Sequence, residues 1–169
     1  MKGDKSFNYR TPPKIIDLAA TILGGIDLDP CAAPNVEHHF AAVNYSLDNG
    51  RDGLSEPWNG KVFINPPAGG MTDLFIRKGL SERDRISQLW LLPAWTSFNW
   101  WDDLIDIARE FAISTERIRF ENARHYSMFP SALALATRND NLKERFITET
   151  YNANFNAYQM IHPLTTLFR

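Results

Sequence analysis

The stretch KVFINPPAGG, residues 61–70, decides how the rest of the chain is interpreted. Its short apolar run, KVFI, predicts a buried strand that stops at Asn65. The next two residues, Pro66 and Pro67, lack a backbone N–H and have a fixed φ, so they hold the backbone rigid. Two explanations stay open: a turn in which Asn65 bonds its own backbone, or a rigid pocket wall whose oxygens accept hydrogen bonds from a ligand's amino group.

Around this stretch, the sequence predicts alternating helices and strands. Residues 14–23 have apolar side chains at helical spacing, with Thr11 suited to the N-cap, Pro12 to the first helical position and Gly24 to the end. Three more helices are expected, over 72–83 with Leu74, Phe75 and Leu80 inward, over 100–111, and over 139–151. Strands are expected over 25–30, 61–64, 86–93, 116–120 and 132–137.

This alternation predicts an α/β fold in which a mostly parallel sheet has helices on both faces. Such sheets bind their ligands at the carboxyl ends of the strands. Three of the expected strands end there in polar or proline-containing loops, at Asp29-Pro30, Asn65-Pro66-Pro67 and Pro93-Ala94. We therefore expect the functional site at these three loops.

Length and composition exclude several classes of protein. The 169 residues suit one domain, and 44% hydrophobic with 22% charged residues is ordinary for a soluble protein. The net charge of −2 argues against electrostatic coating of nucleic acid, although a local basic patch stays possible. The single cysteine, Cys31, rules out an internal disulfide and argues against a zinc site, so no metal is expected. The N-terminus lacks the apolar core of a signal peptide, which predicts a cytoplasmic protein.

Six motifs occur in a specific order: TPP (11–13), DLDPCA (27–32), DGL (52–54) followed by Trp58, NPP (65–67), LLPAWTSFNWW (91–101) and RIRF (117–120). Together they resemble the phage-type DNA N6-adenine methyltransferases, over about residues 9–137. The resemblance implies a Rossmann-like fold, S-adenosylmethionine as cofactor, adenine in DNA as substrate, and a bacteriophage protein working in the bacterial cytoplasm. Residues 138–169 are interpreted as a helical extension of the same single domain.

The NPP motif suits the chemistry of methylating an amino group. The exocyclic nitrogen of adenine is a poor nucleophile because its lone pair is delocalised into the ring. Acceptors for both of its N–H groups favour a pyramidal nitrogen whose lone pair faces the methyl group. The Asn65 side-chain oxygen and the Pro66 carbonyl are such acceptors, and Pro67 helps to fix the backbone that holds them. Asn65, Pro66 and Pro67 are therefore the predicted catalytic residues.

The cofactor is expected near Asp29, because the small residues Cys31, Ala32 and Ala33 that follow allow a ligand to approach the backbone. A carboxylate here can pair with the cofactor's ammonium group; Asp29 is the first candidate and Asp27 the second. The alternative is a solvated Asp-Pro turn.

The resemblance adds further cofactor contacts. It implies that Asp52 accepts a hydrogen bond from the cofactor's adenine and that Thr11 and Pro12 cover its methionine part, with Asn65 also at the cofactor. Glu37 is the candidate for the ribose hydroxyls. Each has a plainer alternative: an Asp-Gly turn at Asp52 and a helix cap at Thr11.

The chain departs from the family pattern at Ala68, where related enzymes carry an aromatic residue that stacks on the extruded base. Loss of one stacking face costs about 1–3 kcal/mol of base binding. Trp95 or Phe98 can supply that face instead. DNA contacts are expected from basic residues, namely Lys2, Lys5, Arg10, Arg117, Arg119, Arg124 and His125, with ordinary solvated charges as the alternative.

Two other functions stay open on the sequence alone. One is a catalytically inactive relative that keeps the fold and acts as a binding protein against a host restriction or defence system; Ala68 and the lack of a glycine-rich loop favour it. The other is an active methyltransferase with a different target, such as RNA or the amino group of cytosine.

Overall fold

The computed structural model describes residues 10–34, 40–67, 69–121 and 123–159. The expectations for Glu37 and Ala68 fall on residues outside these ranges. The helices are α1 (Pro13–Leu23), α2 (Met71–Glu82), α3 (Asn99–Ile107) and α4 (Asp140–Asn152), with a 3-10 helix η1 over Leu47–Asn49. The strands are β1 (Leu28–Asp29), β2 (Val43–Asn44), β3 (Lys61–Ile64), β4 (Ser87–Pro93), β5 (Glu110–Ser114), β6 (Ser131–Ala136) and β7 (Phe155–Gln159).

The strands form a 7-stranded sheet in the order β2-β1-β3-β4-β6-β5-β7. The pairs β1–β2, β1–β3 and β3–β4 are parallel, while β6 runs antiparallel to both β4 and β5, and β7 antiparallel to β5. Five strands therefore share one direction and only β6 and β7 oppose it. This confirms the expected mostly parallel, Rossmann-like sheet.

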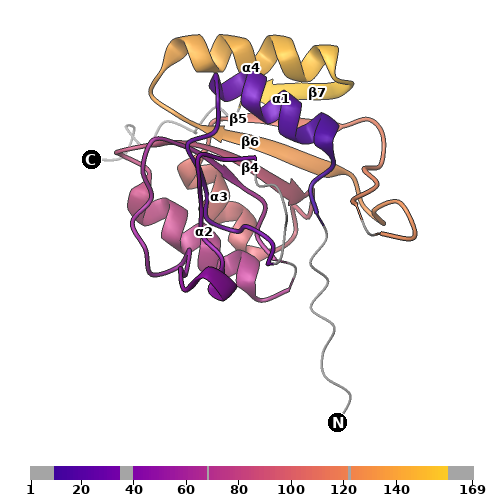
Figure 1. The fold of residues 1–169 in the computed structure, drawn as a ribbon. Helices are drawn as coiled ribbons and strands as arrows, with labels where there is room; N and C mark the ends of the chain where they lie inside the picture. The colour runs from indigo at the N-terminus through magenta and orange to yellow at the C-terminus, as the bar shows by residue number, and fades with distance from the viewer. Residues whose placement is uncertain (1–9, 35–39, 68, 122, 160–169) are drawn as a thin grey trace.

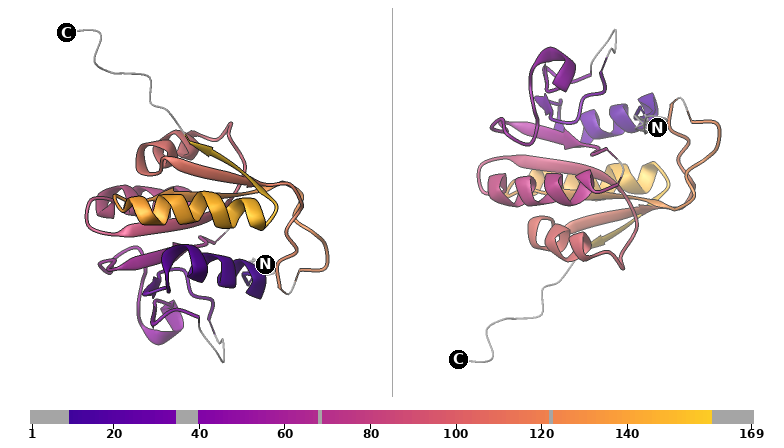
Figure 2. Two further views of the ribbon diagram at one scale, coloured as in Figure 1. Left: turned by 90° about the horizontal axis from the view of Figure 1, so that it is seen from above. Right: turned by 90° about the horizontal axis from the view of Figure 1, so that it is seen from below.

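Helices cover both faces of this sheet, as expected (Figure 1). Figure 2 shows α1 and α4 over one face and α2 and α3 over the other. Strand β6 shows why both faces are apolar: Leu133 and Leu135 pack in the core under α1 and α4, whereas its alternate alanines pack in the core under α2 and α3. Side chains of successive residues in a strand point to opposite faces, so an all-apolar strand fits a sheet that is buried on both sides.

The first helix begins one residue later than predicted. Pro12, not Thr11, is the N-cap, and Pro13 occupies the first helical position. The Thr11 hydroxyl instead accepts a hydrogen bond from Asn65, so the helix-cap assignment of Thr11 was wrong. Gly24 ends the helix in the left-handed conformation, with φ 68°, as predicted.

Two other predictions are corrected by the sheet. The strand expected over 116–120 is replaced by β5, and the helix expected to reach residue 111 ends at Ile107 because Ala108 is already extended. Phe111 and Ala112 then enter the two cores on opposite faces, which a helix could not achieve. In α2, the prediction that Leu74 faces inward was also wrong, because Leu74 is 46% exposed, whereas the neighbouring Phe75 is buried as expected.

The C-terminal helix and strand complete the fold. Helix α4 packs beside α1 on the same face, and Phe146 from its middle is fully buried in that core. Strand β7, which the sequence analysis did not predict, pairs with β5 at the edge of the sheet. No helix in the described part of the chain is long and apolar enough to cross a membrane.

Candidate active site

The carboxyl ends of β1 and β3 bring the Asp-Pro and Asn-Pro-Pro segments to the same edge of the sheet, because Leu28 pairs in parallel with Val62. Asn65 follows β3 directly, and its Nδ2 donates a hydrogen bond of 3.0 Å to Thr11 Oγ1. Thr11 is buried. The predicted site residues Thr11 and Asn65 are therefore in contact, although they lie 54 positions apart in the chain.

Asp29 is buried at the end of β1, with 5% of its surface exposed. Its Oδ1 accepts a 2.8 Å hydrogen bond from the backbone N–H of Cys31. Burial raises the pKa of the Asp29 carboxyl from 3.8 to about 7, against the lowering effect of that hydrogen bond. The carboxyl is therefore not the solvated side chain of a surface turn. Asp27, the second candidate, is exposed, and its Oδ2 accepts from the backbone N–H of Lys61 at the amino end of β3.

Cys31 lies between Asp29 and Asn65. Burial, together with the nearby Asp29 carboxylate, raises the pKa of its thiol well above the usual range, while a hydrogen bond from the Asn65 backbone lowers it. The thiol is thus protonated at neutral pH and unsuited to act as a nucleophile. Cys31 therefore lies where the loops after β1 and β3 meet.

The turn that carries Asp52 packs against the loop after β1. A Cβ atom placed on Gly53 would lie 1.9 Å from the carbonyl oxygen of Pro30, so only glycine allows this approach. The buried Trp58 anchors the turn through a 2.8 Å hydrogen bond from its Nε1 to the Gly53 carbonyl. Asp52 Oδ1 accepts from the Leu54 N–H at 3.0 Å, so this carboxylate also stabilises its own turn.

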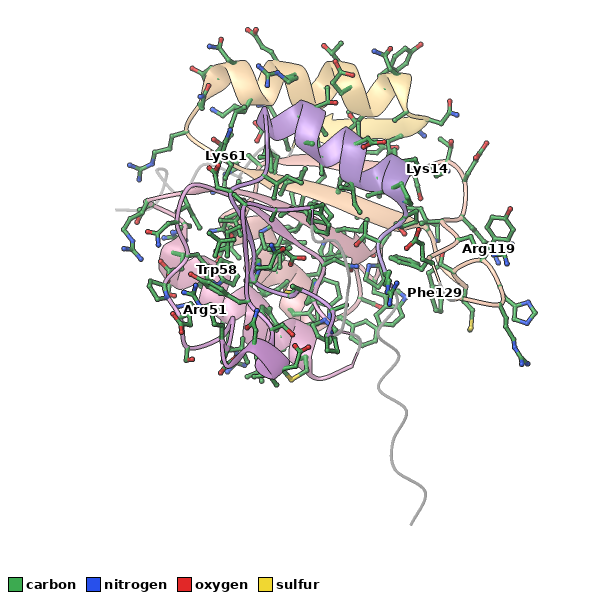
Figure 3. All side chains as sticks on the ribbon, viewed as in Figure 1. Lys14, Arg51, Trp58, Lys61, Arg119 and Phe129 are labelled. Atoms are coloured by element: carbon green, nitrogen blue, oxygen red, sulfur yellow. The ribbon has the colours of Figure 1, made fainter. Side chains whose placement is uncertain are left out.

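A residue that the sequence analysis missed, Tyr45, joins these segments. Its backbone N–H donates to the Asp29 carbonyl at 2.9 Å, and its hydroxyl donates to the Pro57 carbonyl at 2.9 Å. The Arg51 guanidinium lies over the Tyr45 ring, 4.1 Å from its centroid. Figure 3 labels Arg51 and Trp58 in this part of the molecule. An isolated tyrosine in a polar segment gave no signal of this role.

Trp95 and Phe98, the candidates for base stacking, stack on one another after β4. Their ring centroids are 4.9 Å apart and their planes differ by 22°. Phe129, also missed by the sequence analysis, meets Trp95 edge-on at 5.2 Å. Phe98 is 49% exposed, whereas Trp95 Nε1 is buried and has no hydrogen-bond partner in the described part of the chain. Trp100 and Trp101 are buried in the core under α2 and α3, and anchor α3.

The expected DNA-contacting residues Arg10, Arg117, Arg119, Arg124 and His125 are all exposed, and Lys2 and Lys5 lie outside the described residues. Figure 3 shows Arg119, Phe129 and Lys14 on one side of the molecule, with Lys61, at the start of β3, on the other. The segment between β5 and β6, which carries Arg119, therefore lies on the side to which β3 and β4 direct their carboxyl ends. Within the described ranges, no cluster of three or more histidine, cysteine, aspartate or glutamate residues is arranged to hold a metal ion.

Comparison with known proteins identifies the family. The model of the DNA N-6-adenine-methyltransferase (Dam) family matches residues 2–129, which is more than half of the chain. A search of the curated proteins found no match. The matched range includes every residue proposed above for the site, from Thr11 to Phe98, and the sheet has the Rossmann-like form. The chain belongs to the DNA N-6-adenine-methyltransferase family, and its function at the family level is that of a DNA methyltransferase.

Proposed function

We propose that this protein transfers a methyl group from S-adenosylmethionine to the N6 amino group of adenine in DNA. The observation that carries the proposal is the hydrogen bond from Asn65 Nδ2 to Thr11 Oγ1. Because the amide nitrogen is held by Thr11, the amide oxygen is the atom of Asn65 that is available to accept a proton donor. This hydrogen bond therefore supports Asn65 as the acceptor for an amino group.

In this proposal Asn65 Oδ1 and the Pro66 carbonyl each accept one N–H of the adenine amino group. The carbon–N6 bond forms as the carbon–sulfur bond breaks, and one amino proton is lost to solvent. Pro66 is buried and Pro67 is half-buried, and two adjacent proline rings restrict the backbone that carries the acceptors. Acceptors that are fixed before the reaction need no reorganisation in the transition state.

Asp29 and Asp52 are proposed to hold the cofactor, with Thr11, Pro12, Cys31 and Asn65 beside it. S-adenosylmethionine, when bound, supplies an electrophilic methyl group on a sulfonium sulfur. A buried carboxyl whose pKa is raised to about 7 by burial fits the cofactor's ammonium group, since a cation beside it would favour its charged form. Asp52 lies in the turn that packs on Pro30, and its carboxylate is proposed to accept from the cofactor's adenine.

The extruded adenine is proposed to stack on the exposed face of Phe98, with Trp95 behind it. The stacking of Trp95 on Phe98 leaves Phe98 as the outer ring of the pair, 49% exposed. The buried Trp95 Nε1, which has no partner among the described residues, is a donor positioned for a bound group. This pair takes the place of the aromatic residue that position 68 lacks.

The test is mass spectrometry of nucleosides from adenine-unmethylated DNA incubated with the protein and S-adenosylmethionine. N6-methyladenine is expected with the wild type. Asn65→Ala should lose about 100-fold or more of the rate, the usual cost of removing one such acceptor or donor. Its affinity for S-adenosylhomocysteine, measured by calorimetry, should fall far less, because Asp29 and Asp52 remain. Asn59→Ala, an exposed asparagine at the amino end of β3, is the matched control.

A pair of variants at position 11 tests the observation that carries the proposal. Thr11→Val removes the hydroxyl that holds the Asn65 amide, and should lower the rate about tenfold; Thr11→Ser keeps the hydroxyl and should retain most of it. Wild-type protein that binds the cofactor but leaves every DNA base unmodified would contradict the proposal and support the inactive binding protein. N4-methylcytosine as product, or modification of RNA alone, would instead reassign the target.

A further inference from the structure

The loop between β5 and β6, described over residues 115–121 and 123–130 and hereafter the β5–β6 loop, extends from the body of the molecule (Figure 2). Apolar side chains on it are unusually exposed: Tyr126 by 63%, Met128 by 76% and Phe129 by 43%. Large apolar groups that gather on one exposed loop mark an interaction surface more often than a chance exposure.

Basic side chains alternate with these apolar groups. Residues 117–130 contain three arginines and one histidine against a single glutamate, whereas the whole chain has a net charge of −2. Arg119, Arg124 and His125 are exposed. Arginine, tyrosine, methionine and phenylalanine are enriched in protein interfaces as well, so the choice of partner rests on two other observations. The loop is positively charged in a chain of negative net charge, and the family is one of DNA methyltransferases, which favours the phosphate backbone of DNA as the partner.

The base of the loop is fixed, although its tip is exposed. Ile118 is 3% exposed and belongs to the core under α1 and α4, and its carbonyl accepts from the Ser127 N–H at 2.8 Å. At the far end, the Pro130 carbonyl accepts from the Ala94 N–H at 2.9 Å. These bonds hold the loop in one position relative to the sheet.

The loop also reaches the candidate active site. Phe129 lies edge-on to Trp95 at 5.2 Å, and Trp95 stacks on Phe98. On its other side, Glu121 N–H donates to the carbonyl of Arg10 at 3.0 Å, one residue before Thr11. A duplex that presents an adenine to Asn65 would therefore pass beside this loop.

From these contacts we propose that the β5–β6 loop is the element that engages duplex DNA, an inference that rests on the proposed methyltransferase function. Arg119 and Arg124 contact backbone phosphates, while Tyr126 and Met128 insert beside the target base pair. An apolar wedge of this kind offsets the unstacking of the extruded base.

The test measures binding of a fluorescein-labelled duplex of about 30 base pairs, three turns of B-DNA, by anisotropy over a series of salt concentrations. The double variant R119A/R124A should weaken binding at least tenfold and reduce the slope of log Kd against log salt by about 2, since each phosphate contact contributes about 0.9. Y126A/M128A should leave the salt slope unchanged and lower the methylation rate about tenfold.

Matched controls lie far from the loop: Arg138→Ala, at an exposed arginine that follows β6, and Ile147→Ala, at an exposed isoleucine on α4. Neither should alter DNA binding. All variants should keep the thermal unfolding temperature and the S-adenosylhomocysteine affinity of the wild type, which separates this inference from the proposed function. Loop variants that bind DNA like the wild type would overturn the inference while the methylation activity stands. Loop variants that lose affinity for single-stranded RNA but keep the wild-type affinity for duplex DNA would overturn the inference as well.

Discussion

The end of β1 and the turn at residues 52–58 each supply one of the two carboxylates proposed to hold the cofactor. The two carboxylates have different environments. Asp29 is 5% exposed, receives a hydrogen bond from the Cys31 N–H, and has its pKa raised to about 7 by burial. Asp52 is half-buried and accepts a hydrogen bond from the Leu54 N–H of its own turn. Each carboxylate thus accepts a backbone N–H two residues further on, and burial is what distinguishes them. Because Asp29 is buried, its charge is costly without a cationic ligand.

The free-energy cost of burying the charged Asp29 carboxylate depends on pH. Its pKa is raised on folding from 3.8 to about 7, so the folded state binds more protons than the unfolded state between these values. The stability of the cofactor-free protein therefore falls as pH rises through this window, by about 4 kcal/mol in total, and stays low above it. A cation bound beside Asp29 removes this cost.

The largest expected effect comes from Asp29→Asn, which keeps the shape and removes the charge. Affinity for S-adenosylmethionine should fall about 100-fold or more, because the cofactor's ammonium group loses its buried partner. The unfolding temperature of the cofactor-free protein at pH 8 should rise instead. Calorimetric titration and thermal unfolding measure the two effects, with the exposed Asp27→Asn as control. An unchanged affinity would remove Asp29 from the cofactor site.

Gly53→Ala disrupts the contact between the turn at residues 52–58 and the loop after β1. Its Cβ would lie 1.9 Å from the Pro30 carbonyl oxygen, so the turn and the loop after β1 must move apart. We expect a loss of about 1–3 kcal/mol in the free energy of unfolding and a cofactor affinity at least tenfold lower. Gly70→Ala is the control, because a Cβ there meets nothing within 4 Å and φ is −63°. Equal effects from both variants would show that the contact is unimportant.

The pH dependence of binding should separate the two carboxylates. Affinity for S-adenosylmethionine is expected to rise about tenfold from pH 6 to pH 8, about fivefold of it by pH 7, and to level off above pH 8, as Asp29 ionises. Titrations in buffers of different ionisation enthalpy should detect proton release on binding below pH 7. Asp29→Asn should lose this profile and Asp52→Asn should keep it; the reverse result would exchange their assignments.

The smallest effect should be at Asp52, where two substitutions distinguish cofactor binding from turn formation. Asp52→Ala removes the acceptor for the Leu54 N–H and should cost about 1 kcal/mol of stability, together with a several-fold loss of cofactor affinity. Asp52→Asn retains an acceptor for that N–H and should keep the stability. If Asp52→Ala lowers stability but leaves affinity intact, the residue serves only its turn.

Local features of this chain could be predicted from sequence, because each depends on neighbouring residues. The apolar runs of β3, β4 and β6 predict buried strands, and Gly24 predicts the end of α1. The start of β5 could not be predicted, because the helical pattern of the preceding residues continues into it. Its first residue, Glu110, is also of a charged type that is usually exposed, yet only 2% of it is exposed. Polar and apolar side chains alternate in residues 116–120, which predicted a strand, but only Ile118 of that segment is buried.

The candidate site shows the same limit. The identities of Asp29, Asp52 and Asn65 follow from motifs, but their environments depend on contacts between distant segments. An Asp-Pro pair usually indicates a surface turn. Here the Tyr45 N–H donates to the Asp29 carbonyl and the Gly53 turn packs on Pro30, and both contacts come from distant segments. The Thr11–Asn65 hydrogen bond likewise depends on how α1 is placed against the sheet.

The bridge between Arg10 and Glu121 has a consequence for how the two proposed ligands, cofactor and DNA, influence each other. Arg10 adjoins Thr11, which holds Asn65, so one short stretch of backbone contacts both the β5–β6 loop and the amide of the active site. If cofactor binding shifts this stretch and thereby changes the affinity for DNA by some factor, DNA binding must change the affinity for the cofactor by the same factor. We therefore expect substitutions in residues 10–12 to change the coupling between the affinities for cofactor and DNA.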